Sequence, residues 1–127
     1  MHTAGIIAEY NPFHCGHQYH IEETRRQTGA DFIITAISGD FVQRGAPALL
    51  DKYERTAMAL KGGADLVLEL PVTAALSSAE GFATGGVCLF EKLGVTDALS
   101  FGCEDTRDDS LFLRTARLLA EEPEEYM

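Results

Sequence analysis

Short apolar runs alternate along the chain with longer segments whose apolar residues recur at helical spacing. The apolar runs predict buried strands at residues 4–8, 31–38, 66–70 and 98–101. The periodic segments predict helices at residues 16–29, 52–61, 78–93 and 110–122. Strands and helices that alternate in this way predict an α/β fold, in which a parallel sheet is covered by helices on both faces and joined by right-handed crossovers.

Polar and turn residues follow the end of each expected strand. They lie at residues 9–17, 38–45, 69–71 and 102–104. Ligands of open parallel sheets bind beyond the carboxyl ends of the strands. The sequence therefore predicts that these four segments converge on a ligand site at that edge of the sheet.

An H-x-G-H box, residues 14–17, lies between the first expected strand and the first expected helix. Pro12 breaks the chain before the box, and the helix is expected to begin at Gly16 or His17. A helix N-terminus carries unpaired N–H groups and a partial positive charge, which favour phosphate. Gly16 has no Cβ and lets a triphosphate approach the backbone, while His14 and His17 can point both imidazoles at the same phosphates.

Two other interpretations of the histidines are open. They can be surface residues at a helix start, or His14, His17 and His20 can bind a metal. Helical rotation of about 100° per residue carries His20 well around from His14, and no nearby cysteine or carboxylate completes a convincing zinc set. We therefore expect phosphate contact for His14 and His17, no protein-bound metal, and a supporting or surface position for His20.

Four separated strings carry a family resemblance over almost the whole chain. They are AEYNPFH at 8–14, SGDFVQRG at 38–45, LELP at 68–71 and LSFG at 99–102. The H-x-G-H box resembles the signature of the nucleotidyltransferase superfamily, and the four strings closely resemble the bacterial tRNA(Met) cytidine acetate ligases. Cys15 and Ala46 depart from that family, which more often has an asparagine and an acidic residue there. The resemblance implies a Rossmann-like nucleotidyltransferase domain over residues 1–127, as the N-terminal portion of a longer chain.

For function, the resemblance implies an ATP-dependent ligase. Such an enzyme forms acetyl-adenylate from ATP and acetate, and then acetylates the wobble cytidine of elongator tRNA(Met) to N4-acetylcytidine. His14 and His17 are the implied catalytic residues, which donate hydrogen bonds to phosphate oxygens, with Mg²⁺ expected to bridge the phosphates. Acetate is identified by the resemblance alone.

The implied ATP site is the continuous segment after the first strand together with one glycine after the fourth. Its residues are Ile7, Ala8, Glu9, Tyr10, Asn11, Pro12, Phe13, His14, Cys15, Gly16, His17, Gln18, Tyr19, His20 and Gly102. A second set is a candidate for substrate or phosphate contact: Ser38, Gly39, Gln43, Arg44, Lys52 and Arg55. Arg44 offers a planar fork for a carboxylate or phosphate, although its loop can also be an ordinary charged loop. Lys52 and Arg55 either reach the same crevice or solvate their helix.

Charge and cysteine content limit the partners. The chain of 127 residues has a net charge of −10 and 3 cysteines. Residues 1–60 hold 5 basic and 7 acidic side chains, whereas residues 61–127 hold 5 and 13. Because nucleic-acid affinity depends on basic side chains that neutralise phosphates, we expect tRNA to bind mainly through regions absent from this chain. No run approaches the ~18 apolar residues of a membrane span, and the spacing of the cysteines fits a reducing cytoplasm.

Two further classes of function are open. One is a compact adenylyltransferase for a metabolite such as phosphopantetheine or a nicotinamide nucleotide, and the other is a nucleotide-binding module without activity. Nucleotidyltransferases usually place a second basic motif after the last strand to clamp the β- and γ-phosphates, and none appears before Met127. The remaining large apolar residues are interpreted as core without chemistry: Met58, Leu60, Leu66, Val67, Leu68, Cys88, Leu89, Phe90 and Leu93.

Overall fold

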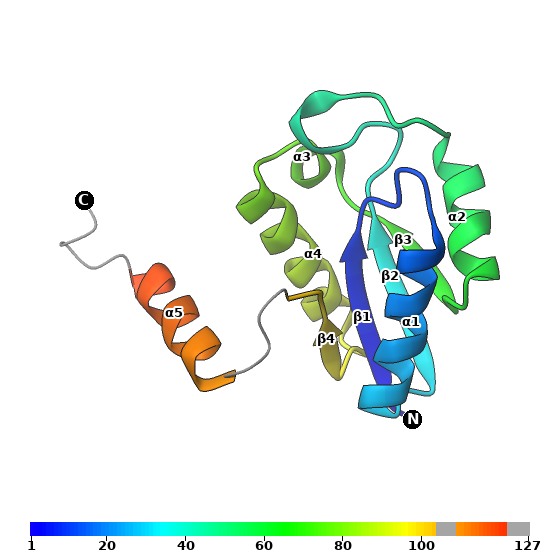
Figure 1. The fold of residues 1–127 in the computed structure, drawn as a ribbon. Helices are drawn as coiled ribbons and strands as arrows, with labels where there is room; N and C mark the ends of the chain where they lie inside the picture. Colours follow the sequence, from blue (N-terminus) through cyan, green and yellow to red (C-terminus); the bar gives the residue numbers. More distant parts are fainter. Residues whose placement is uncertain (104–108, 122–127) are drawn as a thin grey trace.

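The four apolar runs form one parallel sheet. The computed structural model describes residues 1–103 and 109–121, and its strands are β1 (Thr3–Ala8), β2 (Phe32–Ile37), β3 (Leu66–Glu69) and β4 (Ala98–Ser100). Neighbouring strands run parallel in the order β3-β2-β1-β4, so β1 lies inside the sheet (Figure 1). Every predicted strand is present, and the prediction of a parallel sheet is confirmed.

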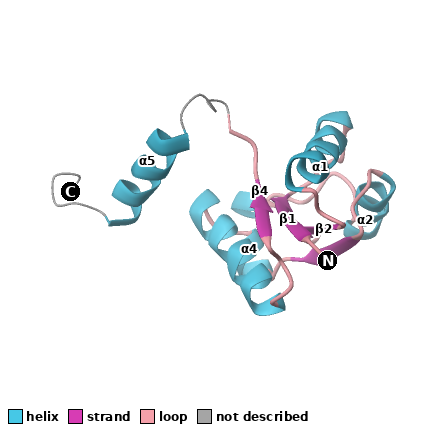
Figure 2. Cartoon of the chain, turned by 90° about the horizontal axis from the view of Figure 1, so that it is seen from below, coloured by secondary structure: helices cyan, strands magenta, loops and turns pink. Residues whose placement is uncertain are grey.

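Helices cover both faces of this sheet, as the alternation predicts. One face carries α1 (Cys15–Thr28) and α2 (Lys52–Lys61), and the other carries α3 (Val72–Ala75) and α4 (Ala79–Leu93) (Figure 1 and Figure 2). The remaining elements are a 3-10 turn, η1 (Gln43–Gly45), and a last helix, α5 (Asp109–Glu121). The sequence pattern does not predict η1 or α3, because each is too short to show a period. Within the described parts of the chain, no helix is both long and apolar enough to cross a membrane.

Polar caps and glycines set the ends of the helices. Asp51 caps α2, where its Oδ1 accepts the Glu54 N–H at 2.9 Å, and Ser78 caps α4 by accepting the Gly81 N–H at 3.3 Å. Gly29 ends α1 in the left-handed conformation at φ 66°, which glycine adopts without strain. The predicted end of the last helix, Glu104 and the acidic run at 122–125 lie outside the described residues.

Each face of the sheet has its own apolar core, because successive side chains of a strand point to opposite faces. Ile33 of β2 packs with Ile6 of β1 beneath α1 and α2. Its neighbour Ile34 packs with Phe82 and Phe90 beneath α3 and α4. The sheet is therefore buried on both sides, and its carboxyl edge is held in a fixed frame.

The predicted core is correct only in part. Four of its members are buried or pack against the two cores: Val67, Leu68, Leu89 and Phe90. For the other five the prediction is wrong, because they are exposed: Met58, Leu60, Leu66, Cys88 and Leu93. On α4, for example, the buried residues are Phe82, Gly86 and Phe90, and helical rotation turns Cys88 to the opposite side. An apolar run in a helix therefore overstates how much of the helix faces the sheet.

The close approach of α4 to β1 generates a test of the packing. A Cβ at Gly86 would lie 2.5 Å from Ile7 Cδ1 and 2.8 Å from its Cγ2. Alanine is favoured over glycine inside a helix by about 1 kcal/mol, but overpacking costs about 1–3 kcal/mol, so Gly86→Ala should lower Tm. In an Ile7→Ala background the same change should raise Tm, because the obstructing atoms are gone. Thermal unfolding of this double-mutant cycle measures the coupling, and additive effects would contradict the close approach.

Candidate functional site

The turn between β1 and α1 carries the H-x-G-H box to the carboxyl edge of the sheet (Figure 1). Tyr10 adopts the left-handed conformation at φ 48°, and a cis peptide joins Asn11 to Pro12. The Tyr10 side chain is 2% exposed, and its ring centroid lies 4.9 Å from that of Phe13. A non-glycine residue with this φ persists only where its surroundings hold it. The turn is therefore held in one conformation by its packing.

His14 and His17 cap the start of α1 reciprocally. The Gly16 N–H donates to His14 Nδ1 at 3.1 Å, and the His14 N–H donates to His17 Nδ1 at 3.2 Å. His14 is thus the N-cap, and α1 begins at Cys15, slightly before the predicted start. The geometry is that of a capping box in which two imidazoles replace the usual hydroxyl and carboxylate.

This cap determines which ring nitrogen of each histidine faces outward. A neutral imidazole whose Nδ1 accepts a hydrogen bond carries its proton on Nε2. The rings of His14 and His17 stack, with centroids 3.6 Å apart and 24° between their planes. The pair therefore presents two neighbouring Nε2–H donors, the arrangement that suits the oxygens of a phosphate chain.

Gly16 makes room for the capping ring of His14. A Cβ at this position would lie 3.0 Å from Cε1 and 3.1 Å from Nδ1 of His14. The structure also corrects the expectation that the N–H groups of the first turn are open, because the Gly16 N–H is already bound to His14. The Cys15 N–H, by contrast, has no hydrogen-bond partner among the residues that the structure describes.

His17 is the more sheltered histidine of the pair. Its ring centroid lies 4.8 Å from that of Tyr10 and 5.6 Å from that of Phe13. Burial lowers the pKa of His17 below its ordinary value of 6.5, and the charges of His14 and His20 lower it further. The ring is therefore neutral near pH 7, which is the form that the reciprocal cap requires.

His20 faces β4 and not the other two histidines. Its Nε2 lies 3.0 Å from Ser100 Oγ, and Thr24 Oγ1 lies 2.6 Å from the same hydroxyl. Burial lowers the pKa of His20 as well. His20 thus links α1 to β4, in agreement with the expected supporting position. Sequence analysis misses Thr24, whose only signal is its place one helical turn after His20.

A groove of about 460 Å³ runs between α1 and β4. Tyr19 and His20 line it from the helix, and Phe101 and Gly102 line it from the end of β4. Gly102 is exposed, and a Cβ there would meet no atom within 4 Å. The fold thus brings Gly102 beside the C-terminal part of the predicted ATP segment, although the two are far apart in the sequence.

Glu9 and Asn11 fasten the loop after β2 to the turn after β1. Glu9 Oε1 accepts the Gln43 N–H at 2.9 Å, and Asn11 Oδ1 accepts the Leu49 N–H at 2.6 Å. Both side chains belong to the predicted ATP segment, and in this structure they bind the protein's own backbone. The loop of residues 38–50 is therefore docked on the turn that precedes the H-x-G-H box.

The basic residues of the second predicted set lie in three different environments. Arg55 is fully buried and donates only to backbone carbonyls, so both expectations, contact with the crevice and solvation of the helix, are wrong. Lys52 Nζ lies 2.8 Å from Glu69 Oε2, and this hydrogen bond raises the pKa of Lys52. Arg44 is exposed at φ 65° and has no partner for its guanidinium within the described residues. It is the one basic candidate of this set that is open to a ligand.

The ends of β2 and β3 meet beside Ser38 and Gly39. Both residues are buried, and Ser38 Oγ has no hydrogen-bond partner among the described residues. A Cβ at Gly39 would lie 2.3 Å from Glu69 Oε1, so the carboxylate occupies the space that this glycine leaves. Glu69 is absent from the predicted set, although its LELP string, residues 68–71, was the signal that could have selected it.

Comparison with known proteins places this chain in a family. The chain matches the family described as HIGH Nucleotidyl Transferase over residues 1–127. The chain belongs to the HIGH nucleotidyltransferase family. This nucleotidyltransferase chain is 56% identical over 127 residues to the tRNA(Met) cytidine acetate ligase of Clostridium kluyveri, a match that covers 98% of this chain and 30% of that protein.

Two more relatives agree with this placement. The tRNA(Met) cytidine acetate ligase of Acetivibrio thermocellus is 49% identical over 126 residues, covering 99% of this chain and 30% of that protein. The crystal structure of Thermotoga maritima TmcAL bound with alpha-thio ATP is 45% identical and superposes with a TM-score of 0.90, covering 99% of this chain and 30% of that chain. The nucleotidyltransferase chain therefore spans about 30% of the length of these relatives, and the predicted fold class is confirmed.

The sheltered neutral histidines predict a loss of stability in mild acid. The pKa values of His17 and His20 are lowered in the folded state, so the unfolded chain binds protons that the folded chain does not. Their contribution to the free energy of unfolding is therefore complete above about pH 6.5 and falls as the pH drops below it. Tm measured from about pH 7.5 to about pH 5.5 should show this decrease. His17→Asn should make the decrease shallower and leave the His20 contribution, because asparagine keeps an acceptor for the cap without titrating. An unchanged slope would contradict the assignment.

Proposed function

We propose that this chain is the ATP-binding and adenylate-transferring part of a tRNA(Met) cytidine acetate ligase. The intact enzyme would activate acetate as acetyl-adenylate and acetylate the wobble cytidine of elongator tRNA(Met) to N4-acetylcytidine. The relatives that carry this name are about half identical to the chain over nearly its whole length. The structural neighbour that contains a nucleotide analogue shares its fold and 45% of its residues.

The observation that carries the proposal is the pair of Nε2–H donors on His14 and His17. Adenylate transfer builds negative charge on the oxygens of the α-phosphate, and preorganised donors stabilise that charge where it forms. The reciprocal cap fixes both rings before any ligand binds. The Cys15 N–H and the positive end of the α1 dipole also stabilise negative charge at this position. His14 and His17 are thus the proposed catalytic residues.

The reaction has two balanced steps. A carboxylate oxygen of acetate attacks the α-phosphorus of ATP, the bond from that phosphorus to the bridging oxygen of the β-phosphate breaks, and pyrophosphate leaves. The exocyclic amine of cytidine then attacks the acyl carbon of acetyl-adenylate, loses a proton, and AMP leaves. The protein forms no covalent bond in either step, so its task is to position the reactants and to stabilise charge.

The groove between α1 and β4 is the proposed place for the nucleoside part of ATP. Its lining combines the aromatic side chains Tyr19 and Phe101 with the polar side chain of His20, and Tyr19 follows the H-x-G-H box by two residues. Gly102 leaves its backbone open for close approach at the mouth of this groove. Of the predicted ATP residues outside the box, Tyr19, His20 and Gly102 line this groove and are assigned to the nucleoside, whereas His14 and His17 are assigned to the phosphates.

Mg²⁺ is proposed to enter with ATP, bound to its phosphates as part of the substrate. Within residues 1–103 and 109–121, no three His, Cys, Asp or Glu side chains are grouped so that they could hold a metal ion. We assign Mg²⁺ no separate step.

Acetate and tRNA(Met) are proposed substrates of the intact enzyme. The net charge of −10 makes this chain a poor surface for the tRNA phosphates. We assign tRNA contact mainly to the part of the ligase that this chain does not cover, since the chain spans about 30% of its relatives. Arg44, with its exposed guanidinium, is a candidate for a carboxylate or phosphate oxygen at the edge of the site.

Exchange of labelled pyrophosphate into ATP tests the first half-reaction without tRNA. Adenylate transfer is reversible while acetyl-adenylate stays bound, so the intact protein should exchange label only when acetate is present. Exchange that ignores acetate and needs phosphopantetheine or nicotinamide mononucleotide would favour a metabolite adenylyltransferase. Binding of ATP without any exchange would favour a nucleotide-binding module and contradict the proposal.

Asparagine variants separate catalysis from helix capping. The amide oxygen of asparagine can replace Nδ1 as the cap acceptor, and asparagine is among the favoured N-cap residues. His14→Asn and His17→Asn should therefore keep Tm nearly unchanged at pH 7.5 while they reduce exchange by about 10²-fold or more. His17→Gln is the matched control, because it can keep a donor near Nε2 but loses the cap acceptor. Exchange at the wild-type rate in both asparagine variants would contradict the catalytic assignment.

A further inference from the structure

Arg55 is a fully buried arginine whose guanidinium binds backbone alone. Its Nη1 donates to the Glu9 carbonyl at 2.7 Å, and its Nε donates to the Leu50 carbonyl at 3.1 Å. Its Nη2 donates to the Ser38 carbonyl at 3.0 Å and also to the Gly39 carbonyl. One side chain thus joins the turn after β1, the loop after β2 and the approach to α2. Only a planar group with several divergent donors can make these contacts together.

The contact with Glu9 connects Arg55, through Tyr10, to His17, the proposed catalytic histidine. The Glu9 carbonyl belongs to the peptide that precedes Tyr10, the residue with φ 48°. The orientation of that peptide is part of what holds Tyr10 in its left-handed conformation. The Tyr10 ring in turn packs 4.8 Å from His17 between centroids. Arg55, Glu9, Tyr10 and His17 therefore form a continuous chain of contacts from the buried guanidinium to the proposed phosphate donor.

We propose that Arg55 is a positioning residue, which sets the orientation of His17 for adenylate transfer through the Glu9 carbonyl and the Tyr10 ring. Its effect on the reaction rate rests on the proposed function, whereas its effect on the His17 environment does not. The loop contacts of Glu9 and Asn11 with residues 43 and 49 support the same geometry from the surface. Arg55 supports it from the interior.

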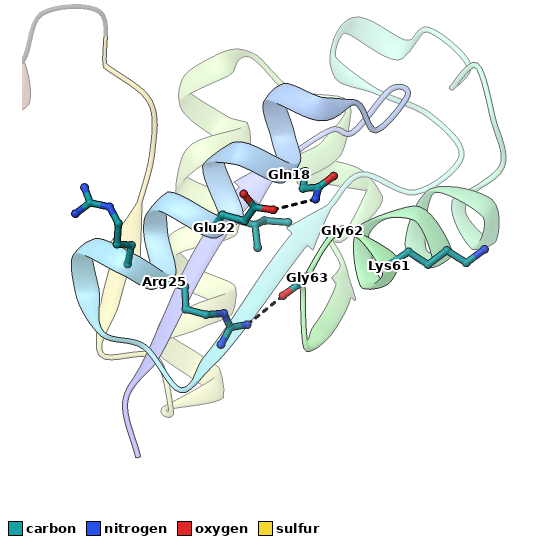
Figure 3. A pocket seen from close by; sticks show the side chains of 8 residues that line it. Gln18, Glu22, Arg25, Lys61, Gly62 and Gly63 are labelled. Carbon is teal, nitrogen blue, oxygen red and sulfur yellow. Dashed lines mark hydrogen bonds between the residues drawn. The ribbon is translucent and has the colours of Figure 1, made fainter.

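Arg25 provides a matched control at the opposite end of the sheet. Its guanidinium also ties segments together, because it donates to the Gly63 carbonyl at 3.1 Å (Figure 3). It donates as well to the Asp31 carbonyl and to the Asp65 carboxylate, each at 2.7 Å. These segments precede β2 and β3 and do not carry the H-x-G-H box. Both arginines therefore stabilise the fold through backbone contacts, but only Arg55 is connected to His17.

The test compares Arg55→Met and Arg55→Lys with Arg25→Met. Each variant should lower Tm, because backbone carbonyls lose their donors. The position of His17 is read from the NMR titration of its ring protons in the 127-residue chain, assigned with His17→Asn. In the Arg55 variants the pKa of His17 should rise toward 6.5, because the Tyr10 ring no longer shelters it. His14, which stacks on His17, and His20, whose charge also lowers the His17 pKa, are titrated in parallel.

The kinetic arm uses acetate-dependent exchange in the intact protein. The Arg55 variants should lose about 10- to 100-fold in kcat, the scale expected when a catalytic group is displaced by a fraction of an ångström or more. KM for ATP should change less, since Arg55 makes no hydrogen bond to a residue that lines the nucleoside groove. Arg25→Met should leave the His17 pKa and kcat unchanged. If the wild type shows no exchange, the proposed function fails while the titration still decides the role of Arg55.

If Arg55→Met does not fold, two variants of Tyr10 test whether the Tyr10 ring transmits the effect of Arg55 to His17. Tyr10→Phe keeps the ring and should leave the His17 pKa lowered, whereas Tyr10→Leu removes the ring and should raise it as the Arg55 variants do. Equal losses of Tm in the Arg55 and Arg25 variants, with the His17 pKa unmoved in both, would show that Arg55 is structural only. An unmoved His17 pKa in Tyr10→Leu would overturn the route through Tyr10.

Discussion

The geometry of the site depends on two hydrogen bonds between imidazole Nδ1 atoms and backbone N–H groups at the start of α1. The Gly16 N–H binds His14, and the His14 N–H binds His17. These bonds satisfy two donors that a helix start would otherwise leave unpaired. They also fix the tautomer of both rings, so each imidazole directs an N–H group away from the helix. Helix capping and presentation of donors are thus performed by the same two side chains.

The magnitudes of these two roles differ. A helix cap contributes about 0.5–2 kcal/mol to stability, whereas one preorganised donor at a developing oxyanion contributes about 2.7–4 kcal/mol to catalysis. A hydroxyl or amide would cap α1 equally well, so capping alone does not explain two histidines. Tyr10 and Phe13 shelter His17 and keep it neutral, which is the state that the cap and the proposed donor role both need.

The frame that holds the turn is distributed over three layers of contact. On the outside, Glu9 and Asn11 accept backbone N–H groups of the loop after β2. In the interior, Arg55 binds carbonyls of the same loop and turn. Beneath both, β1 and β2 pair in parallel and direct these segments to one edge of the sheet. The carboxyl edge of a parallel sheet is where loops from neighbouring strands can make such contacts.

The sequence by itself determined the strands, the main helices and the location of the H-x-G-H box between β1 and α1, because these follow from local periodicity, caps and glycines. Only the tertiary structure decided which side of each helix is buried, as Cys88 and Met58 show, since burial depends on how a helix is rotated against the sheet. Only the tertiary structure also decided that Arg55 is buried. A basic residue on an amphipathic helix is expected to be exposed, and its burial becomes favourable only when carbonyls from distant segments converge on its donors.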